Sequence, residues 1–179
     1  MSEAEIRAYA TSKGFHPQTL ERWLSWRAAD AAALARLAFV LKISENHLRD
    51  LIDWLEEVAL RDGVQIHAVL TSKAINDIET DPRLGRADRL KRIKEQVRRL
   101  RFPRLAETED AIRAKIQELK LHPAIRLTVP AGLEGGQVRV ELVAASQNEL
   151  RQLAMKLSEA TEKASMPEIF ALLAGHSNR

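Results

Sequence analysis

The sequence predicts a mainly α-helical protein, with a tandem helix-turn-helix-like domain followed by a small α-β-β-α module. Two observations lead to this fold class. Apolar residues recur every three or four positions through most of the chain before His122, as they do on one face of a helix. After His122-Pro123 the apolar period changes to two, which is typical of half-buried strands.

The composition limits the class of protein. With 179 residues the chain suffices for one domain with a real core or for two small ones, and 45% hydrophobic and 30% charged residues are typical of globular proteins. No apolar run approaches the roughly 20 residues of a membrane span, and the start of the chain does not resemble a secretory signal. The absence of cysteine excludes disulfides and thiolate metal sites. We therefore expect a cytoplasmic protein without a membrane partner.

Helix boundaries in the first half follow from caps and breakers. Ser2 and Glu5 predict a capping box for a short first helix. Further helix starts are predicted at Pro17, Asp30 and Ser44, and stops at Gly14 and Gly63. Residues 64–80 favour one helix or two short ones. A basic helix is expected from about 86 to 101, ended by Pro103, and another from about 106 to 121.

The second half contains two alternating segments. Residues 124–130 and 137–144 predict two strands, and the glycines between them predict a β-hairpin. Ser146 and Glu149 predict the start of another helix, and a last short helix follows from Pro167. The expected domains are a helical domain over 1–80, the basic helix within 81–104, and the α-β-β-α module with its C-terminal helix over 105–179.

Residues 6–24 match a helix-turn-helix. Such a motif needs a small residue in its first helix, a turn residue that tolerates positive φ, and an apolar residue after the turn. Ala10, Gly14 and Phe15 meet these needs. Side chains expected to point outward from the second helix and to contact DNA bases are Gln18, Thr19 and Arg22.

A second, similar pattern spans residues 34–52. Ala38 is the small residue and Ile43 the apolar one, but Lys42 stands where glycine is preferred. The side chains expected at DNA bases are Asn46, His47 and Arg49. Because the helix over 45–57 is acidic, phosphates would repel much of it. The first pattern is therefore the preferred DNA reader, and the second either copies it structurally or docks a protein partner.

Cations are concentrated in one window of the chain. Residues 83–104 hold ten basic and two acidic side chains, whereas the whole chain has a net charge of +3. A basic helix face most often meets a duplex backbone. The expected phosphate contacts are Lys91, Arg92, Lys94, Arg98, Arg99 and Arg101. The competing interpretation is a solvated face, or one that pairs with the acidic helix 45–57 of the same chain.

The tail predicts a homodimer. A lone two-stranded hairpin is marginal in water and leaves open edges, so that a second copy of the chain could pair with one edge. The residues expected to form the dimer are Ile125, Leu127, Val129, Val138, Val140, Leu142, Leu150, Leu153 and Leu157.

No catalytic constellation, cofactor motif or metal-ligand spacing stands out. The five histidines lack ligand spacing, and the GLEGG segment lacks the Lys-Ser/Thr of a phosphate loop. We therefore expect a protein that is not an enzyme and holds neither cofactor nor metal.

The order of parts resembles the ParB-type partition proteins of bacterial chromosomes and plasmids. The resemblance rests on the segment ISENHLRDLIDWL within 31–60, and on EDAIRAKIQELKLHPAIRLTVP, GGQVRVELVA and SQNELRQLAMKL within 108–160. It implies a dimeric helix-turn-helix protein that binds double-stranded DNA in partition or transcription regulation. The family's N-terminal nucleotide-binding domain has no counterpart here. The alternative function is a protein-interaction scaffold that binds no nucleic acid.

Overall fold

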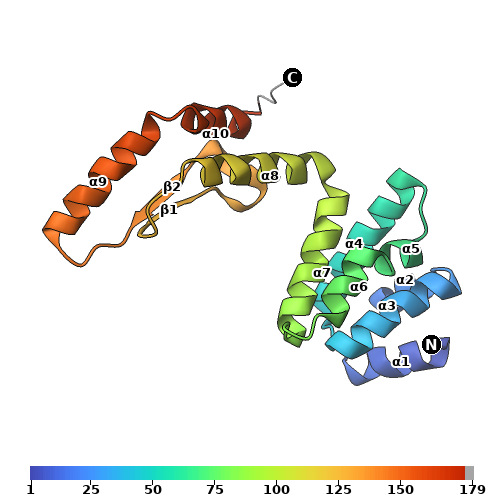
Figure 1. Ribbon diagram of the computed structural model, residues 1–179. Coiled ribbons are helices and arrows are strands. Elements are labelled where there is room, and N and C mark those ends of the chain that lie inside the picture. The colour runs from blue at the N-terminus through green and yellow to red at the C-terminus, as the bar shows by residue number, and fades with distance from the viewer. Residues whose placement is uncertain (176–179) are drawn as a thin grey trace. The chain divides into compact units, whose positions relative to one another are not determined.

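The computed structural model describes residues 1–175 and confirms the mainly α fold class (Figure 1). The chain divides into two compact units, one over Met1–Phe102 and one from Pro103 onward. The basic helix, which the sequence set apart from the first domain, packs within the first unit. No helix in residues 1–175 is both long enough and apolar enough to cross a membrane.

The first unit consists of seven helices in its described chain. They are α1 (Glu3–Ser12), α2 (Pro17–Leu24), α3 (Ala28–Leu41), α4 (Glu45–Asp62), α5 (Ile66–Leu70), α6 (Lys73–Thr80) and α7 (Arg86–Arg101). The segment 64–80 therefore forms two short helices. The capping box of α1 is present, because the Ser2 hydroxyl accepts from the Glu5 backbone N–H and the Glu5 carboxylate accepts from the Ser2 backbone N–H.

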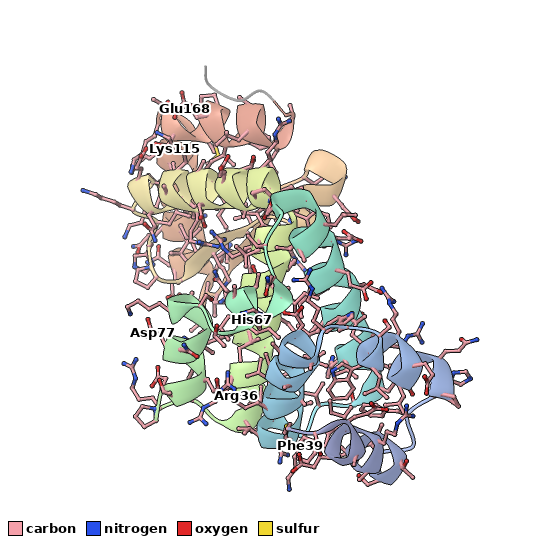
Figure 2. All side chains as sticks on the ribbon, turned by 90° about the vertical axis from the view of Figure 1, so that its right-hand side faces the viewer. Arg36, Phe39, His67, Asp77, Lys115 and Glu168 are labelled. Atoms are coloured by element: carbon pink, nitrogen blue, oxygen red, sulfur yellow. The ribbon has the colours of Figure 1, made fainter. Side chains whose placement is uncertain are left out.

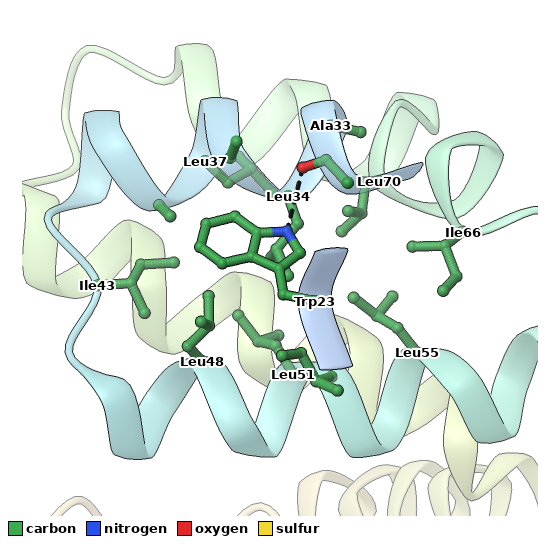
Figure 3. Packing of buried hydrophobic residues seen from close by; sticks show 14 of the residues in the cluster. Trp23, Ala33, Leu34, Leu37, Ile43, Leu48, Leu51, Leu55, Ile66 and Leu70 are labelled. Atoms are coloured by element: carbon green, nitrogen blue, oxygen red, sulfur yellow. Dashed lines mark hydrogen bonds between the residues drawn. The ribbon is translucent and has the colours of Figure 1, made fainter. Parts of the chain in front are cut away.

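Helix α3 forms the centre of the first unit. It is apolar almost all round, as expected for a buried helix, and Leu34, Leu37 and Ala38 are completely inaccessible. Trp23 of α2 packs against it and donates its indole N–H to the Ala31 carbonyl at 3.2 Å (Figure 3). This hydrogen bond satisfies the one polar group that the tryptophan brings into the core.

Asp30 does not cap α3, contrary to the sequence prediction. The helix begins at Ala28, so Asp30 lies within its first turn, and its carboxylate is buried. The side chain accepts instead from the backbone N–H of His67 at 2.7 Å, at the start of α5. A carboxylate from one helix thus satisfies the orphan donor of another.

Helix α7 closes the unit by burying Ile93 and Val97, both fully inaccessible, in the same core as α3 and α4. Leu90 and Leu100 of the same helix are half-buried against this core, and its other residues are mostly polar. Because Ile93 and Val97 are four residues apart, they lie on one face of the basic helix, which is part of the core, and only the rest of the helix is left for other contacts.

The second unit begins with α8 (Pro103–Glu118) and contains the predicted antiparallel hairpin. Its other elements are β1 (Ile125–Thr128), the 3₁₀ helix η1 (Ala131–Gly136), β2 (Arg139–Leu142), α9 (Gln147–Thr161) and α10 (Ser165–Leu173). Cross-strand partners are Ile125 with Leu142, Arg126 with Glu141, Leu127 with Val140, and Thr128 with Arg139. Because opposed residues share a face, one face of the hairpin is apolar and the other polar.

Helices α8 and α10 pack on each other and form a separate small core. Its buried members are Ile112, Leu119, Leu127, Met166 and Ile169. An ion pair closes its edge, with Lys115 Nζ 2.8 Å from Glu168 Oε2 (Figure 2). Helix α9 extends beyond the hairpin, away from this helix pair (Figure 1).

Candidate nucleic-acid interface

The two helix-turn-helix patterns fold into turns of the same geometry. Gly14 and Lys42 both have positive φ, at 67° and 51°. Phe15 donates its backbone N–H to Ala10 at 2.9 Å, and Ile43 donates to Ala38 at 3.0 Å. In each turn the residue after the left-handed position therefore bonds back across the last helical turn. Lys42 adopts a conformation that glycine favours. The turn therefore keeps the shape of the first one although lysine replaces the preferred glycine.

The turn between α3 and α4 is further secured from α1. The Tyr9 hydroxyl lies 2.8 Å from the Ala38 carbonyl and 3.0 Å from the Ile43 carbonyl, on the two sides of the turn. Burial raises the pKa of Tyr9, which keeps this donor protonated. The first helix of the chain thus supports the second helix-turn-helix.

Within the described chain, the first helix-turn-helix leaves only one of its three predicted base readers both exposed and free of a partner side chain. Thr19 is buried rather than outward-pointing, and its hydroxyl donates to Glu45 at 2.6 Å. Arg22 contacts Asp53 at 2.5 Å and Glu56 at 2.6 Å, both on α4. Only Gln18 of the three residues is exposed without such a partner side chain in this part of the structure. Helix α2 therefore packs its polar face on α4.

Glu45 connects α2 to the first turn of α4. Its carboxylate accepts from the Thr19 hydroxyl and from the His16 backbone N–H at 3.0 Å. These two hydrogen bonds, the one from Thr19 foremost, lower the pKa of Glu45. The acid nearest the start of α4 is therefore ionised and already occupied by hydrogen-bond donors.

The second helix-turn-helix does expose its predicted readers. Asn46, His47 and Arg49 lie exposed on the first two turns of α4, while Leu48 and Leu51 anchor the helix in the core. The acids that argued against this helix lie mostly further along it. Asp53 and Glu56 pair with Arg22, and these hydrogen bonds, Glu56 foremost, raise the pKa of Arg22. The start of α4 thus carries the exposed predicted base readers, and the acids further along the helix are paired with cations.

Lys94, Arg98 and Arg101 among the predicted phosphate contacts pair with acids of the same chain. Lys94 pairs with Asp50 at 2.6 Å, Arg98 with Glu95 at 2.8 Å and Arg101 with Glu57 at 2.5 Å. Arg99 is half-buried, whereas Lys91 and Arg92 are exposed. The competing interpretation of the basic stripe, pairing with the acidic helix of the same chain, therefore applies to Lys94 and Arg101.

The ion pairs reveal how α4 and α7 are aligned. Lys94 and Arg101 are seven residues apart, as are their partners Asp50 and Glu57. Equal spacing in the same direction means that the helices run parallel, in register over two turns. Lys91, one turn before Lys94, therefore lies level with the exposed start of α4.

Some residues that hold α4 and α7 together belong to no motif that can be recognised in the sequence. Arg61 donates to the Leu100 and Arg101 carbonyls, each at 2.7 Å, at the C-terminal end of α7. Trp54 lies under Lys94, whose Nζ is 5.3 Å from the ring centroid. Cations favour the C-terminal ends of helices, but the sequence does not show that Arg61 of α4 lies beside the end of α7. Only the packing of the two helices reveals this contact.

A hollow of about 370 Å³ joins the two predicted reader helices. Its lining residues are His16, Gln18, Thr19, Arg22, Arg49 and Ile52. The two candidate sets, 18–22 on α2 and 46–49 on α4, therefore meet along one surface of the first unit. They are not two independent groove readers.

The predicted dimer residues divide between core and surface. Ile125, Leu127 and Leu153 are buried in the second unit, and Val129, Val138, Leu142 and Leu157 are half-buried. Val140 and Leu150 are exposed by 41% and 47%. Only these two members present large apolar surface in the single chain.

Comparison with known proteins adds no family assignment: no protein-family model, curated protein or solved structure matches this chain.

Proposed function

We propose that the chain is a homodimeric DNA-binding protein in which the start of α4 enters the major groove. One observation carries this proposal. The first two turns of α4 expose Asn46, His47 and Arg49, while its acids hold partners from α2 and α7. Asn and Arg side chains pair with adenine and guanine edges, and recognition helices read bases through their N-terminal residues.

In this proposal the second helix-turn-helix contacts the bases, and the first supports it. Thr19 and Arg22 are engaged with α4, so they orient the reader helix and do not read bases themselves. Gln18 and Arg49 line one hollow, which supports a role for Gln18 at the margin of the proposed DNA surface.

Phosphate contacts come from the exposed cations in the first half of α7. Lys91 and Arg92 are exposed, and the parallel register brings Lys91 level with the start of α4. Each neutralised phosphate adds about 0.9 to the slope of the logarithm of affinity against the logarithm of salt concentration. Two such contacts give a modest salt dependence, smaller than the dependence that the six phosphate contacts predicted from the sequence would give.

The second unit supplies the proposed dimer contact. β2 pairs with β2 of a second copy, antiparallel and centred on Val140. In that register Arg139 of each copy faces Glu141 of the other, and Val138 faces Leu142. Both ion pairs then lie on the polar face of the hairpin, which already sets Arg126 against Glu141, and the apolar face continues across four strands.

A dimer of this kind agrees with the resemblance to ParB-type partition proteins, which implies a C-terminal dimer module and a role in partition or transcription regulation. A two-fold dimer positions two reader helices on two half-sites of a duplex. The cytoplasm is the compartment that this role requires.

The test is a binding measurement on selected and random DNA. Duplexes are selected on the full chain from a random-sequence library, and fluorescence anisotropy then gives affinities at two salt concentrations. Arg49→Ala should weaken the selected duplex by about 10- to 100-fold and random duplex little. The matched control is Arg113→Ala on α8, which should leave both affinities unchanged. A chain that binds no duplex at low salt overturns the proposal.

The phosphate contacts have a separate signature. Lys91→Ala with Arg92→Ala should weaken selected and random duplexes alike and reduce the salt slope by about 2. Lys73→Ala, on α6, is the control, because Lys73 holds Asp77 on its own helix. A loss confined to the selected duplex would assign base reading to α7 instead.

A second candidate function, a protein-interaction adaptor, is favoured by one observation. Leu60 is 88% exposed and lines a hollow of about 290 Å³. The other lining residues are Asp53, Glu56 and Glu57 together with Arg22 and Arg101, the two arginines that pair with these acids. An exposed apolar side chain surrounded by paired charges suits an apolar peptide segment with polar flanks. The adaptor becomes the leading function if the anisotropy experiment finds no DNA binding at low salt.

A further inference from the structure

Lys94 reaches from α7 to two side chains of α4. Its Nζ lies 2.6 Å from Asp50 Oδ2 and 3.1 Å from Nδ1 of His47. The stem of Lys94 is largely covered, with 18% of the side chain exposed, and the ammonium also lies over the ring of Trp54. The ammonium group is therefore held in place by three neighbours on one helix.

The chemistry of this contact determines which ring nitrogen of His47 accepts a hydrogen bond. A lysine ammonium has three donors and no acceptor, so the ring nitrogen facing it must accept the hydrogen bond. Nδ1 then carries a lone pair, and the neutral imidazole must carry its proton on Nε2. Since His47 is exposed, its Nε2–H is the ring's remaining polar group toward solvent.

We infer that Lys94 is a positioning residue that fixes His47 as a hydrogen-bond donor toward DNA, so that this position of α4 selects guanine. This inference rests on the proposed function. Guanine presents two adjacent acceptors, N7 and O6, on its major-groove edge, whereas adenine sets one acceptor, N7, beside an amine donor, thymine presents one acceptor, O4, and cytosine presents a donor. A single donor is therefore best satisfied at guanine. A histidine free to exchange tautomers accepts from the amines of adenine and cytosine as readily as it donates to guanine.

The ion pair between Asp50 and Lys94 supports this role of Lys94. Asp50 neutralises Lys94, so the ammonium contributes little as a phosphate contact and can act on His47 without a net positive charge beside it. A free carboxylate at Asp50 would accept a hydrogen bond from a cytosine amine and would favour cytosine at this position. The ion pair with Lys94 prevents that contact.

The first test needs no DNA. Long-range proton–nitrogen correlation spectra of the full chain report which ring nitrogen of His47 is protonated. We expect the Nε2–H form in the natural sequence and a mixture of tautomers in Lys94→Met. Lys94→Arg should keep the Nε2–H form, because arginine also only donates. Lys73→Met, on α6, is the control and should leave the signal of His47 unchanged, because Lys73 pairs with Asp77 on its own helix.

Two results would overturn the inference at this stage: an Nδ1–H form in the natural sequence, or no change in Lys94→Met. Thermal unfolding of Lys94→Met confirms that the variant is folded before its spectrum is compared. Because the spectra concern the free protein, their failure is distinct from a failure of DNA binding.

The second test compares base preferences selected from the same random duplex library. Lys94→Met should lower the preference for guanine at one position of the site by about fivefold, which is typical of one neutral hydrogen bond, and leave the other positions unchanged. His47→Ala should remove the preference at that same position. An equal loss of affinity on all duplexes would mean that His47 donates to a phosphate and would overturn the assignment of guanine.

Discussion

The carboxylate of Asp30 on α3 receives two hydrogen bonds from His67 on α5. The backbone N–H of His67 lies 2.7 Å away and the ring Nδ1 lies 3.0 Å away, both from the same carboxylate oxygen. Asp30 is the one charged residue among the buried side chains of the described chain. A short helix of five residues, α5, is thereby tied to the central helix of the unit.

Removing this carboxylate should destabilise the first unit. Asp30→Ala leaves the backbone N–H of His67 without its acceptor in a partly buried place, which costs about 1–3 kcal/mol. Urea unfolding followed by circular dichroism measures the loss. The control is Asp77→Ala, which removes an exposed ion pair to Lys73 within α6 and should change the free energy of unfolding by less than about 0.5 kcal/mol. Equal effects of the two changes would contradict the structural role of Asp30.

The left-handed conformation of Lys42 predicts a stabilising substitution. Its φ and ψ, 51° and 49°, cost a side-chain-bearing residue about 1 kcal/mol relative to glycine. Lys42→Gly should therefore raise the free energy of unfolding by up to about 1 kcal/mol. Lys13→Gly is the matched control, because Lys13 ends α1 in the right-handed region, where glycine brings no such relief. A loss of stability in both variants would argue against strain at the turn.

The proposed dimer makes a prediction at the open edge of the hairpin. Val140→Lys places two like charges opposite each other across the two-fold axis, so the chain should become monomeric in light scattering. Thr128→Lys adds the same charge on the polar face of β1, away from the joining edge, and should leave a dimer. A natural chain that is monomeric, or a Val140→Lys variant that remains a dimer, would exclude pairing through β2.

Asp81 predicts a measurable acid titration. Hydrogen bonds from Arg83, the side chain first and the backbone second, lower its pKa from 3.8 to about 2. Since the pKa in the folded protein lies below the unfolded value, the interaction stabilises the fold above about pH 4 and is lost as the pH falls toward 2. Carboxyl carbon NMR should find the midpoint near 2 and a higher midpoint in Arg83→Ala. An unchanged midpoint in Arg83→Ala would contradict this cause.

Much of the fold follows from local rules that the sequence states directly. The capping box of Ser2 and Glu5, the stop at Gly63 and the change of period at His122 all mark element boundaries through interactions within a few residues. Both helix-turn-helix patterns were predictable for the same reason, because a small residue, a turn and an apolar residue act within one segment. Even the substitution of Lys42 for glycine did not disturb the turn.

What the sequence by itself determined is therefore the set of helices and strands and the two reader-like turns, since these depend on neighbours along the chain. Only the tertiary structure decided which charges face the solvent. The parallel alignment of α4 with α7 joins residues more than forty positions apart, such as Lys94 and Asp50, and so removes cations from the basic stripe. Likewise Thr19 is buried and Arg22 is paired with acids of α4, because α2 packs on α4. Charge along a helix is a local property, but its neutralisation depends on which helix packs beside it.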